Sequence, residues 1–116
     1  MNFDGLLMSM QSFLGEQVLL SLAPVGRSDA APIGVRGSLE RGVSTFLQGP
    51  GYPDEAVVFH IGPDAHITLQ RSHIRVAAWL DDEQRVLWFD QGGLMVTICR
   101  AHDARRLQEK ARELLE

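Results

Sequence analysis

The sequence has little cysteine and no long apolar run, and each shortage excludes a class of protein. Cys99 is the single cysteine among 116 residues, so neither a disulfide within the chain nor a metal site of several cysteines can form. The N-terminus is acidic at Asp4 and lacks a small-residue cleavage site, which argues against a secretion signal. The longest apolar stretch, 18–25, is far shorter than the roughly 20 residues that span a bilayer. We expect a soluble, cytoplasmic protein without membrane association.

Basic residues are also scarce. Lys110 is the single lysine among 11 basic residues, and 15 acidic residues give a formal net charge of −4. Nucleic-acid-binding modules usually carry a basic excess, because neutralising phosphates supplies most of their non-specific affinity. The charge balance therefore argues against a nucleic-acid partner. The length and the 45% hydrophobic content fit one globular domain over 1–116.

The first clear pattern in the sequence is the spacing of an amphipathic helix over 2–14. Its apolar residues lie three and four apart, and Asn2 and Gly15 occupy the positions of an N-cap and of a C-terminal glycine cap. The opposite face is polar but almost uncharged, with Asp4, Ser9, Gln11 and Ser12. Such a face suits packing against the body of the protein or contact with another subunit.

Between residues 16 and 99 the apolar period changes from 3.6 to 2, which predicts about six to seven short strands. No helical segment separates these strands, so we expect an antiparallel sheet rather than a parallel one. The predicted fold is mainly β: a small, strongly bent barrel over 16–99, with the N-terminal helix before it and a C-terminal helix over 103–115 capped by Asp103.

Glycine, proline and acidic clusters predict the connections. We expect a five-residue loop over 62–66 that pairs Ile61 with Ile67. The segment 42–55 is expected to be a long loop, because Gly49-Pro50-Gly51-Tyr52-Pro53 cannot form a central strand. We also expect an acidic turn at 81–84 and a glycine turn at 91–93. A bend or bulge is expected at 71–73, and a shorter loop at 27–32.

The hairpin over 74–90 is apolar on both faces. One face carries Val76, Ala78, Leu80, Val86 and Trp88, and the other carries Ala77, Trp79, Leu87 and Phe89. Strands that are apolar on both sides must be covered twice, once by the core and once by a terminal helix or a second copy. We therefore expect a homo-oligomer, with another protein as the alternative partner. The expected interface residues are Leu6, Met10, Trp79, Leu87, Trp88 and Phe89.

Four residues are candidate metal ligands because imidazole and carboxylate groups bind zinc and iron: His60, Asp64, His66 and His73. Their spacing matches no established metal motif, so exposed or hydrogen-bonded histidines are the favoured interpretation, and we expect no cofactor.

Cys99 and His102 suggest a nucleophilic pair, but no acidic residue is assigned to orient the histidine. We favour a buried cysteine and a protein that is not an enzyme.

Three arginines in or near strands are candidate anion ligands: Arg36, Arg71 and Arg75. Solvated strand edges paired with acidic residues are the favoured alternative.

Two segments resemble the Sm-like small β-barrels over residues 3–80. Val35-Arg36-Gly37-Ser38-Leu39 looks like the second strand of that family. The segment 67–75 is similar to its late Arg-Gly-x-Asn-hydrophobic motif. The resemblance implies a small barrel that assembles into rings and binds RNA.

Our leading hypothesis is a non-enzymatic β-barrel module that acts as an oligomeric scaffold or a protein-interaction domain. The alternatives are an Sm-like binder of RNA or another anion, and a small histidine-dependent metal-binding protein or enzyme.

Overall fold

The computed structural model describes residues 1–26, 33–48, 53–106 and 109. Helix α1 (Phe3–Gln11) comes before all of the strands. The strands are β1 (Gln17–Pro24), β2 (Ile33–Gln48), β3 (Pro53–Ile61), β4 (Ala65–Gln70), β5 (Ile74–Trp79), β6 (Leu87–Gln91) and β7 (Leu94–Arg100). Two short 3-10 helices complete the elements, η1 (Arg71–His73) between β4 and β5 and η2 (Ala101–Asp103) after β7.

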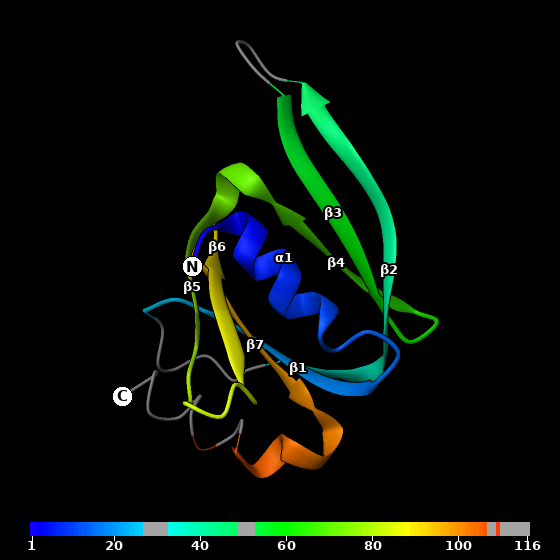
Figure 1. The fold of residues 1–116 in the computed structure, drawn as a ribbon, viewed down its shortest axis with the longest axis vertical. Helices are drawn as coiled ribbons and strands as arrows, with labels where there is room; N and C mark the ends of the chain where they lie inside the picture. The colour runs from blue at the N-terminus through cyan, green and yellow to red at the C-terminus, as the bar shows by residue number, and fades with distance from the viewer. Residues whose placement is uncertain (27–32, 49–52, 107–108, 110–116) are drawn as a thin grey trace.

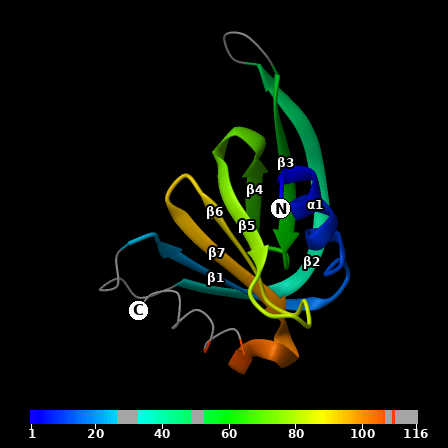
Figure 2. The same cartoon turned by 60° about the vertical axis from the view of Figure 1, so that its left-hand side comes forward.

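All seven strands form one antiparallel sheet in the order β4-β3-β2-β1-β7-β6-β5, which confirms the mainly β class. The sheet curves around α1, and the β2–β3 hairpin extends beyond the rest of it (Figures 1 and 2). The sheet is small, antiparallel and strongly bent as predicted, but it is not closed into a barrel, because β4 and β5 remain the two edges. The three-residue η1 carries the chain from one edge to the other without pairing them.

The side chain of Gln91 bridges the open seam. The Gln91 amide at the end of β6 donates from Nε2 to the carbonyl oxygen of Thr68 at 2.8 Å. Its Oε1 accepts from the backbone N–H of Gln70 at 3.0 Å. This amide therefore satisfies two outward-facing groups of edge strand β4, as a neighbouring strand would.

Helix α1 begins as the sequence predicts. The Asn2 side chain accepts a hydrogen bond from the Gly5 amide at 2.8 Å, so Asn2 is the N-cap. The helix ends at Gln11, and the chain leaves it through Gly15, whose φ of 79° is in the left-handed region. The Gly15 N–H donates to the Leu39 carbonyl at 2.8 Å, which ties the end of the helix to β2.

The core fills the concave side of the sheet. Its largest fully buried side chains are Phe13, Phe59, Phe89, Leu6 and Met10. A second, smaller cluster on the outer side contains Leu19, Val86 and Cys99, with Leu80 and Ala104 packed against it. The chain itself therefore covers part of both faces of the 74–90 hairpin.

The predicted long loop over 42–55 is wrong for its described residues. β2 continues to Gln48 and β3 begins at Pro53, with a register shift between Arg41 and Ser44. A proline is tolerated as the first residue of a strand, and a bulge absorbs the irregular segment around Gly42. The connecting residues 49–52, and the loop predicted over 27–32, lie outside the described part of the chain.

The β3–β4 connection is shorter than predicted. Ile61 pairs with Ala65 and Phe59 with Ile67, so three residues rather than five join the strands. Gly62 adopts a φ of 67°, which permits the tighter turn. Because the register differs by two residues, every side chain keeps its predicted face.

The other predicted turns are confirmed. Gly92 and Gly93 both have positive φ between β6 and β7, residues 81–84 form the turn before β6, and η1 provides the expected bend at 71–73. Asp103 does not cap a helix: it lies within η2 and pairs with Arg85 at 3.3 Å. Residues 104–106 are helical, and most of the helix predicted over 103–115 falls outside the described residues.

In the described part of the chain, no helix has the length and apolar character required to cross a membrane.

Candidate functional site

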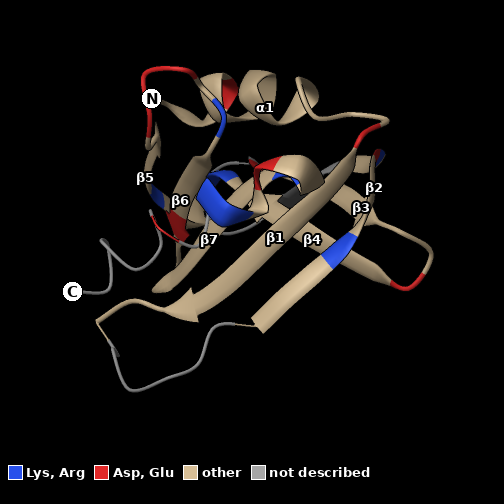
Figure 3. Cartoon of the chain, turned by 90° about the horizontal axis from the view of Figure 1, so that it is seen from below, with Lys and Arg blue, Asp and Glu red and all other residues tan. Residues whose placement is uncertain are grey.

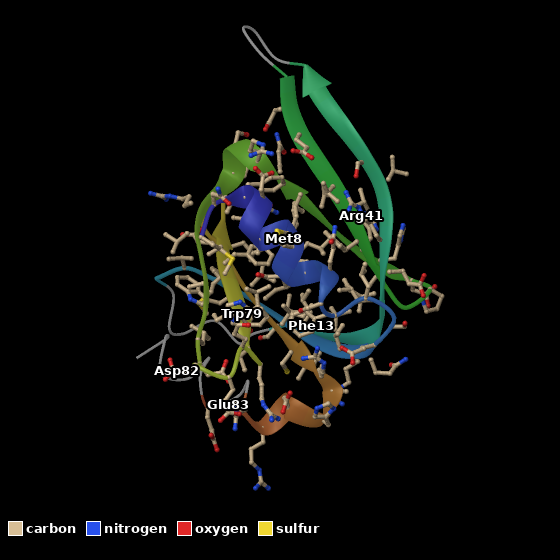
Figure 4. The ribbon with its side chains drawn as sticks, in the orientation of Figure 1. Met8, Phe13, Arg41, Trp79, Asp82 and Glu83 are labelled. Atoms are coloured by element: carbon tan, nitrogen blue, oxygen red, sulfur yellow. The ribbon has the colours of Figure 1, made fainter. Side chains whose placement is uncertain are left out.

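An open groove of about 460 Å³ lies between the outer face of α1 and the turn that joins β5 to β6. The helix contributes Met8 and Ser9, and Ser12 follows it. Trp79, Glu83, Gln84 and Arg100 line the rest. Figure 4 shows Met8 on the helix, with Trp79 and Phe13 near it and Glu83 on the turn.

The floor of the groove is aromatic. Trp79 at the end of β5 is half-buried, and its ring lies 5.8 Å from that of the fully buried Phe13. The Arg100 guanidinium stacks over the Phe13 ring, 5.0 Å from its centroid. Arg100 also donates to Glu16 at 2.6 Å and to the Ser12 carbonyl at 3.1 Å, so these contacts hold its planar head in place.

The helical wall is uncharged, and it presents the side chain of Met8 together with the hydroxyls of Ser9 and Ser12. No charged residue occurs between Gly5 and Gly15. Met8 is 73% exposed, although methionine is usually buried. Figure 3 shows α1 uncoloured apart from the acidic residue in its first turn, while the turn beside it is acidic.

The opposite wall is a well-anchored turn. The Asp81 carboxylate accepts from the backbone amides of Arg85 and Val86 at 3.0 and 3.1 Å and from Arg106 at 3.0 Å. Burial raises the pKa of Asp81, but these hydrogen bonds outweigh burial and leave that pKa lowered. Glu83 pairs with Arg106 at 2.8 Å, and this contact lowers the pKa of the Glu83 carboxyl.

Gln84 adopts a left-handed conformation with a φ of 56° and is the only described non-glycine residue with positive φ. Such a conformation costs roughly 1–2 kcal/mol for most residues. Strained positions of this kind gather at binding and catalytic sites, which supports a role for the groove.

This arrangement suits a partner that covers two at least partly exposed apolar side chains, Met8 and Trp79, within a mostly polar and charged rim. Tryptophan, methionine and arginine are enriched in protein interfaces, where a few well-packed anchors supply most of the affinity. Trp79, Met8 and Arg100 combine these three types around one groove.

Among the expected interface residues, Trp79 is the only one that lines this groove. Trp88 is half-buried on the outer side of the sheet. The remaining four are buried in the chain's own core: Leu6, Met10, Leu87 and Phe89. The chain covers these four without a partner, so the apolar hairpin alone gives no reason for a second subunit.

The candidate metal ligands separate into two places. His60 and His66 face each other across β3 and β4, with ring centroids 6.2 Å apart, and both are exposed. Asp64 lies in the turn joining these strands, while His73 lies in η1 beyond the far end of β4. No three ligating side chains come together to hold a metal within the described ranges.

The Cys99 thiol is fully buried, and burial, together with the nearby Asp103, raises its pKa to about 12. It therefore remains a thiol at neutral pH and is not an activated nucleophile. His102 is exposed and lies 3.5 Å from the Asp103 carboxylate.

The three candidate anion-binding arginines do not gather. Arg36 lies on β2 and Arg75 on β5, with three strands between them in the sheet. Arg71 stacks on Phe3 and pairs with Asp4 at 2.8 Å and Glu55 at 2.6 Å. Arg71 thus fastens the start of α1 to β3 and η1.

Met8, Arg100 and Glu83 were not predicted as site residues. Met8 does carry a signal in the sequence, since it is an apolar residue outside the apolar spacing of its helix. The position of Arg100 against Phe13 depends on the pairing of β7 with β1, which local sequence does not encode.

No protein family, curated protein or solved structure matches the chain.

Proposed function

We propose that the protein is a non-enzymatic interaction module that self-associates through the groove between α1 and the β5–β6 turn. The observation that carries this proposal is the exposure of Met8, 73% accessible on an uncharged helix face beside the half-buried Trp79. A large apolar side chain beside an aromatic floor gains free energy when a second surface removes both from water.

The polar groups of the helix face oppose this association only weakly. The Ser9 hydroxyl donates to the Gly5 carbonyl at 2.9 Å, and the Ser12 hydroxyl donates to the Ser9 carbonyl at 2.6 Å. Both hydroxyl protons therefore already have partners within the helix. Covering this face leaves neither donor unsatisfied, which avoids the main cost of burying polar groups.

The charges around the groove are compatible with a second copy of this chain as the partner, because Arg100 already pairs with Glu16, and Glu83 with Arg85 and Arg106. Arg100 lies on the β7 side and Glu83 on the turn side, and both remain partly exposed. In a two-fold contact the same patch meets itself, so each copy presents one cation and one anion to the other. Such a pairing has no net charge repulsion.

The Sm-like resemblance suggests a different assembly, a ring formed through sheet edges. In this chain Gln91 already occupies two outward-facing backbone groups of β4. We therefore favour the helix surface over edge pairing, and the native mass distinguishes a dimer from a ring of more copies.

The test is sedimentation equilibrium of the wild-type chain and of Met8→Glu at concentrations up to about 100 µM, where a Kd of 10 µM is well populated. Val43→Glu is the matched control, because Val43 is 69% exposed on β2 and lies outside the groove. We expect a wild-type dimer, at least tenfold weaker association in Met8→Glu, and unchanged association in Val43→Glu.

A wild-type chain that remains monomeric throughout this range refutes self-association. An equal effect of the two substitutions shows that the copies do not meet at this groove. A discrete mass of more than two copies that survives Met8→Glu favours the ring instead.

A further inference from the structure

The outer face of the β2–β3–β4 part of the sheet carries a row of three residues whose side chains can bind metal ions. Glu40 on β2 pairs with His60 on β3, and His60 pairs with His66 on β4. Directly paired residues of antiparallel strands share one face, so these three side chains project from the same side. That side is away from the core, since the neighbouring Phe59 and Ile61 are buried and both histidines are exposed.

The hydrogen-bonding pattern places the two histidines in the closer of the two types of cross-strand pair. The Thr68 carbonyl and the Gln70 amide of β4 point outward to Gln91, so alternate residues of β4, including His66, direct their backbone groups away from β3. His60 and His66 therefore form a non-hydrogen-bonded pair, the type in which side chains of adjacent strands approach most closely. Their ring centroids are 6.2 Å apart, with the planes at 56°.

Gly42 provides the space in which the His60 ring lies. A Cβ atom at this position would be 2.7 Å from Nε2 of His60, so the ring occupies room that any other residue would fill. The ring edge that carries Nε2 therefore faces β2, although the side chain as a whole is exposed.

We propose that His60 and His66 form a two-histidine site for a divalent transition-metal ion, with water in the remaining coordination positions. A metal bond to imidazole nitrogen is about 2.0–2.1 Å long, so one ion holds two ring nitrogens within about 4 Å of each other. In the structure the Nε2 edge of His60 faces Gly42 on β2, so metal binding requires the exposed His60 ring to turn from β2 towards His66 on β4. Copper(II), nickel(II) and zinc(II) suit imidazole ligands, whereas magnesium prefers oxygen.

Glu40 supports the ion by its charge and not as a ligand. Its carboxylate does not complete a three-residue cluster with the rings. Its place next to His60 in the row still puts a negative charge near the cation.

The test is titration of the full chain with copper(II) and with magnesium, followed by calorimetry and by NMR of the histidine ring protons. The substitutions are His60→Gln and His66→Gln, with His73→Gln and His102→Gln as matched controls, because these are the other two histidines of the chain. We expect one copper site, at least tenfold weaker after either of the first two substitutions and unchanged in the controls. Copper should broaden the ring signals of His60 and His66 first, and magnesium should not bind.

Equal copper affinity in all four variants overturns the proposal, and so does first broadening at His73 or His102. Thermal unfolding of each variant verifies that a lost site does not reflect a lost fold. The outcome is independent of self-association, since the histidine row and the α1 groove share no residue.

Discussion

The Gln91 amide should stabilise the open seam of the sheet, and replacing it tests how that seam is held. Gln91→Leu keeps a side chain of similar size and removes both hydrogen bonds to β4, at 2.8 Å to Thr68 and 3.0 Å to Gln70. The amide orientation follows from its partners, because only Oε1 can accept from the Gln70 N–H and only Nε2 can donate to the Thr68 carbonyl.

A hydrogen bond within a protein contributes roughly 0.5–1.5 kcal/mol net to stability. Both bonds here are partly buried, and water can reach the freed backbone groups. We therefore expect Gln91→Leu to lower the free energy of unfolding by about 1–2 kcal/mol. With a urea m-value of about 1.5 kcal/mol/M, the midpoint falls by about 1 M.

Two measurements verify this prediction. Urea unfolding gives the total loss, with Gln17→Leu as the control because Gln17 is exposed on β1. Amide hydrogen exchange reports the bond itself: the Gln70 N–H should lose protection in Gln91→Leu. Gln91→Glu retains an acceptor for that N–H and loses the donor to Thr68, so Gln70 should remain more protected there than in the leucine variant.

The reasoning is refuted if Gln91→Leu leaves the Gln70 amide as protected as in the wild type. It is also refuted if the two leucine variants lose the same stability, since the effect would then come from added apolar surface.

Three further predictions concern the local structure. The Asp54 carboxylate accepts from the Ser72 hydroxyl at 2.5 Å and from the Gln70 side chain at 2.6 Å, and these bonds lower the pKa of Asp54. The stability that Asp54 contributes is therefore present above the ordinary aspartate pKa of about 4 and is lost as the pH falls through the lowered pKa. Asp54→Asn should reduce the loss of stability that urea unfolding measures between pH 7 and pH 3. Cys99, with its pKa near 12, should react with a disulfide reagent at pH 8 only in denaturant, and rapid reaction of the native chain would contradict its burial. Gly37→Ala should cost about 1–3 kcal/mol because its Cβ would lie 2.6 Å from the Gly62 nitrogen, whereas Gly34→Ala has a nearest neighbour at 3.9 Å and should cost less in the same unfolding assay.

Local signals in the sequence predict most of the elements. The cap at Asn2, the alternation of the strands and the glycines at 92 and 93 each act over a few residues, and the structure has all of them. The β3–β4 register is wrong by two residues because Gly62 permits a tighter turn than the loop composition suggests. The even shift preserved the faces, so the buried set was predicted even where the pairing was not.

The closure of the sheet and the content of the site depend on distant residues. The alternation of apolar and polar residues is the same in an open sheet and in a barrel, so it did not show that β4 and β5 stay apart. The groove joins α1, the β5–β6 turn and β7, and it forms only when these segments meet. The uncharged helix face and Trp79 were identified in the sequence and both line the proposed site, whereas Arg100 reaches it only through the pairing of β7 with β1.

The two proposed sites lie on opposite sides of the sheet, because one side is covered by α1 and the other side is exposed along β3. The concave side binds α1 so completely that Leu6 and Met10 are fully buried, whereas Met8, on the opposite side of the same helix, remains exposed. On the outer side of β3, alternation exposes His60 between Phe59 and Ile61, which both face the core. A partner that covers Met8 therefore approaches from the helix side and leaves the histidine row accessible. We expect copper to bind the dimer and the monomer equally, because linkage between the two sites requires that one change the other's contacts.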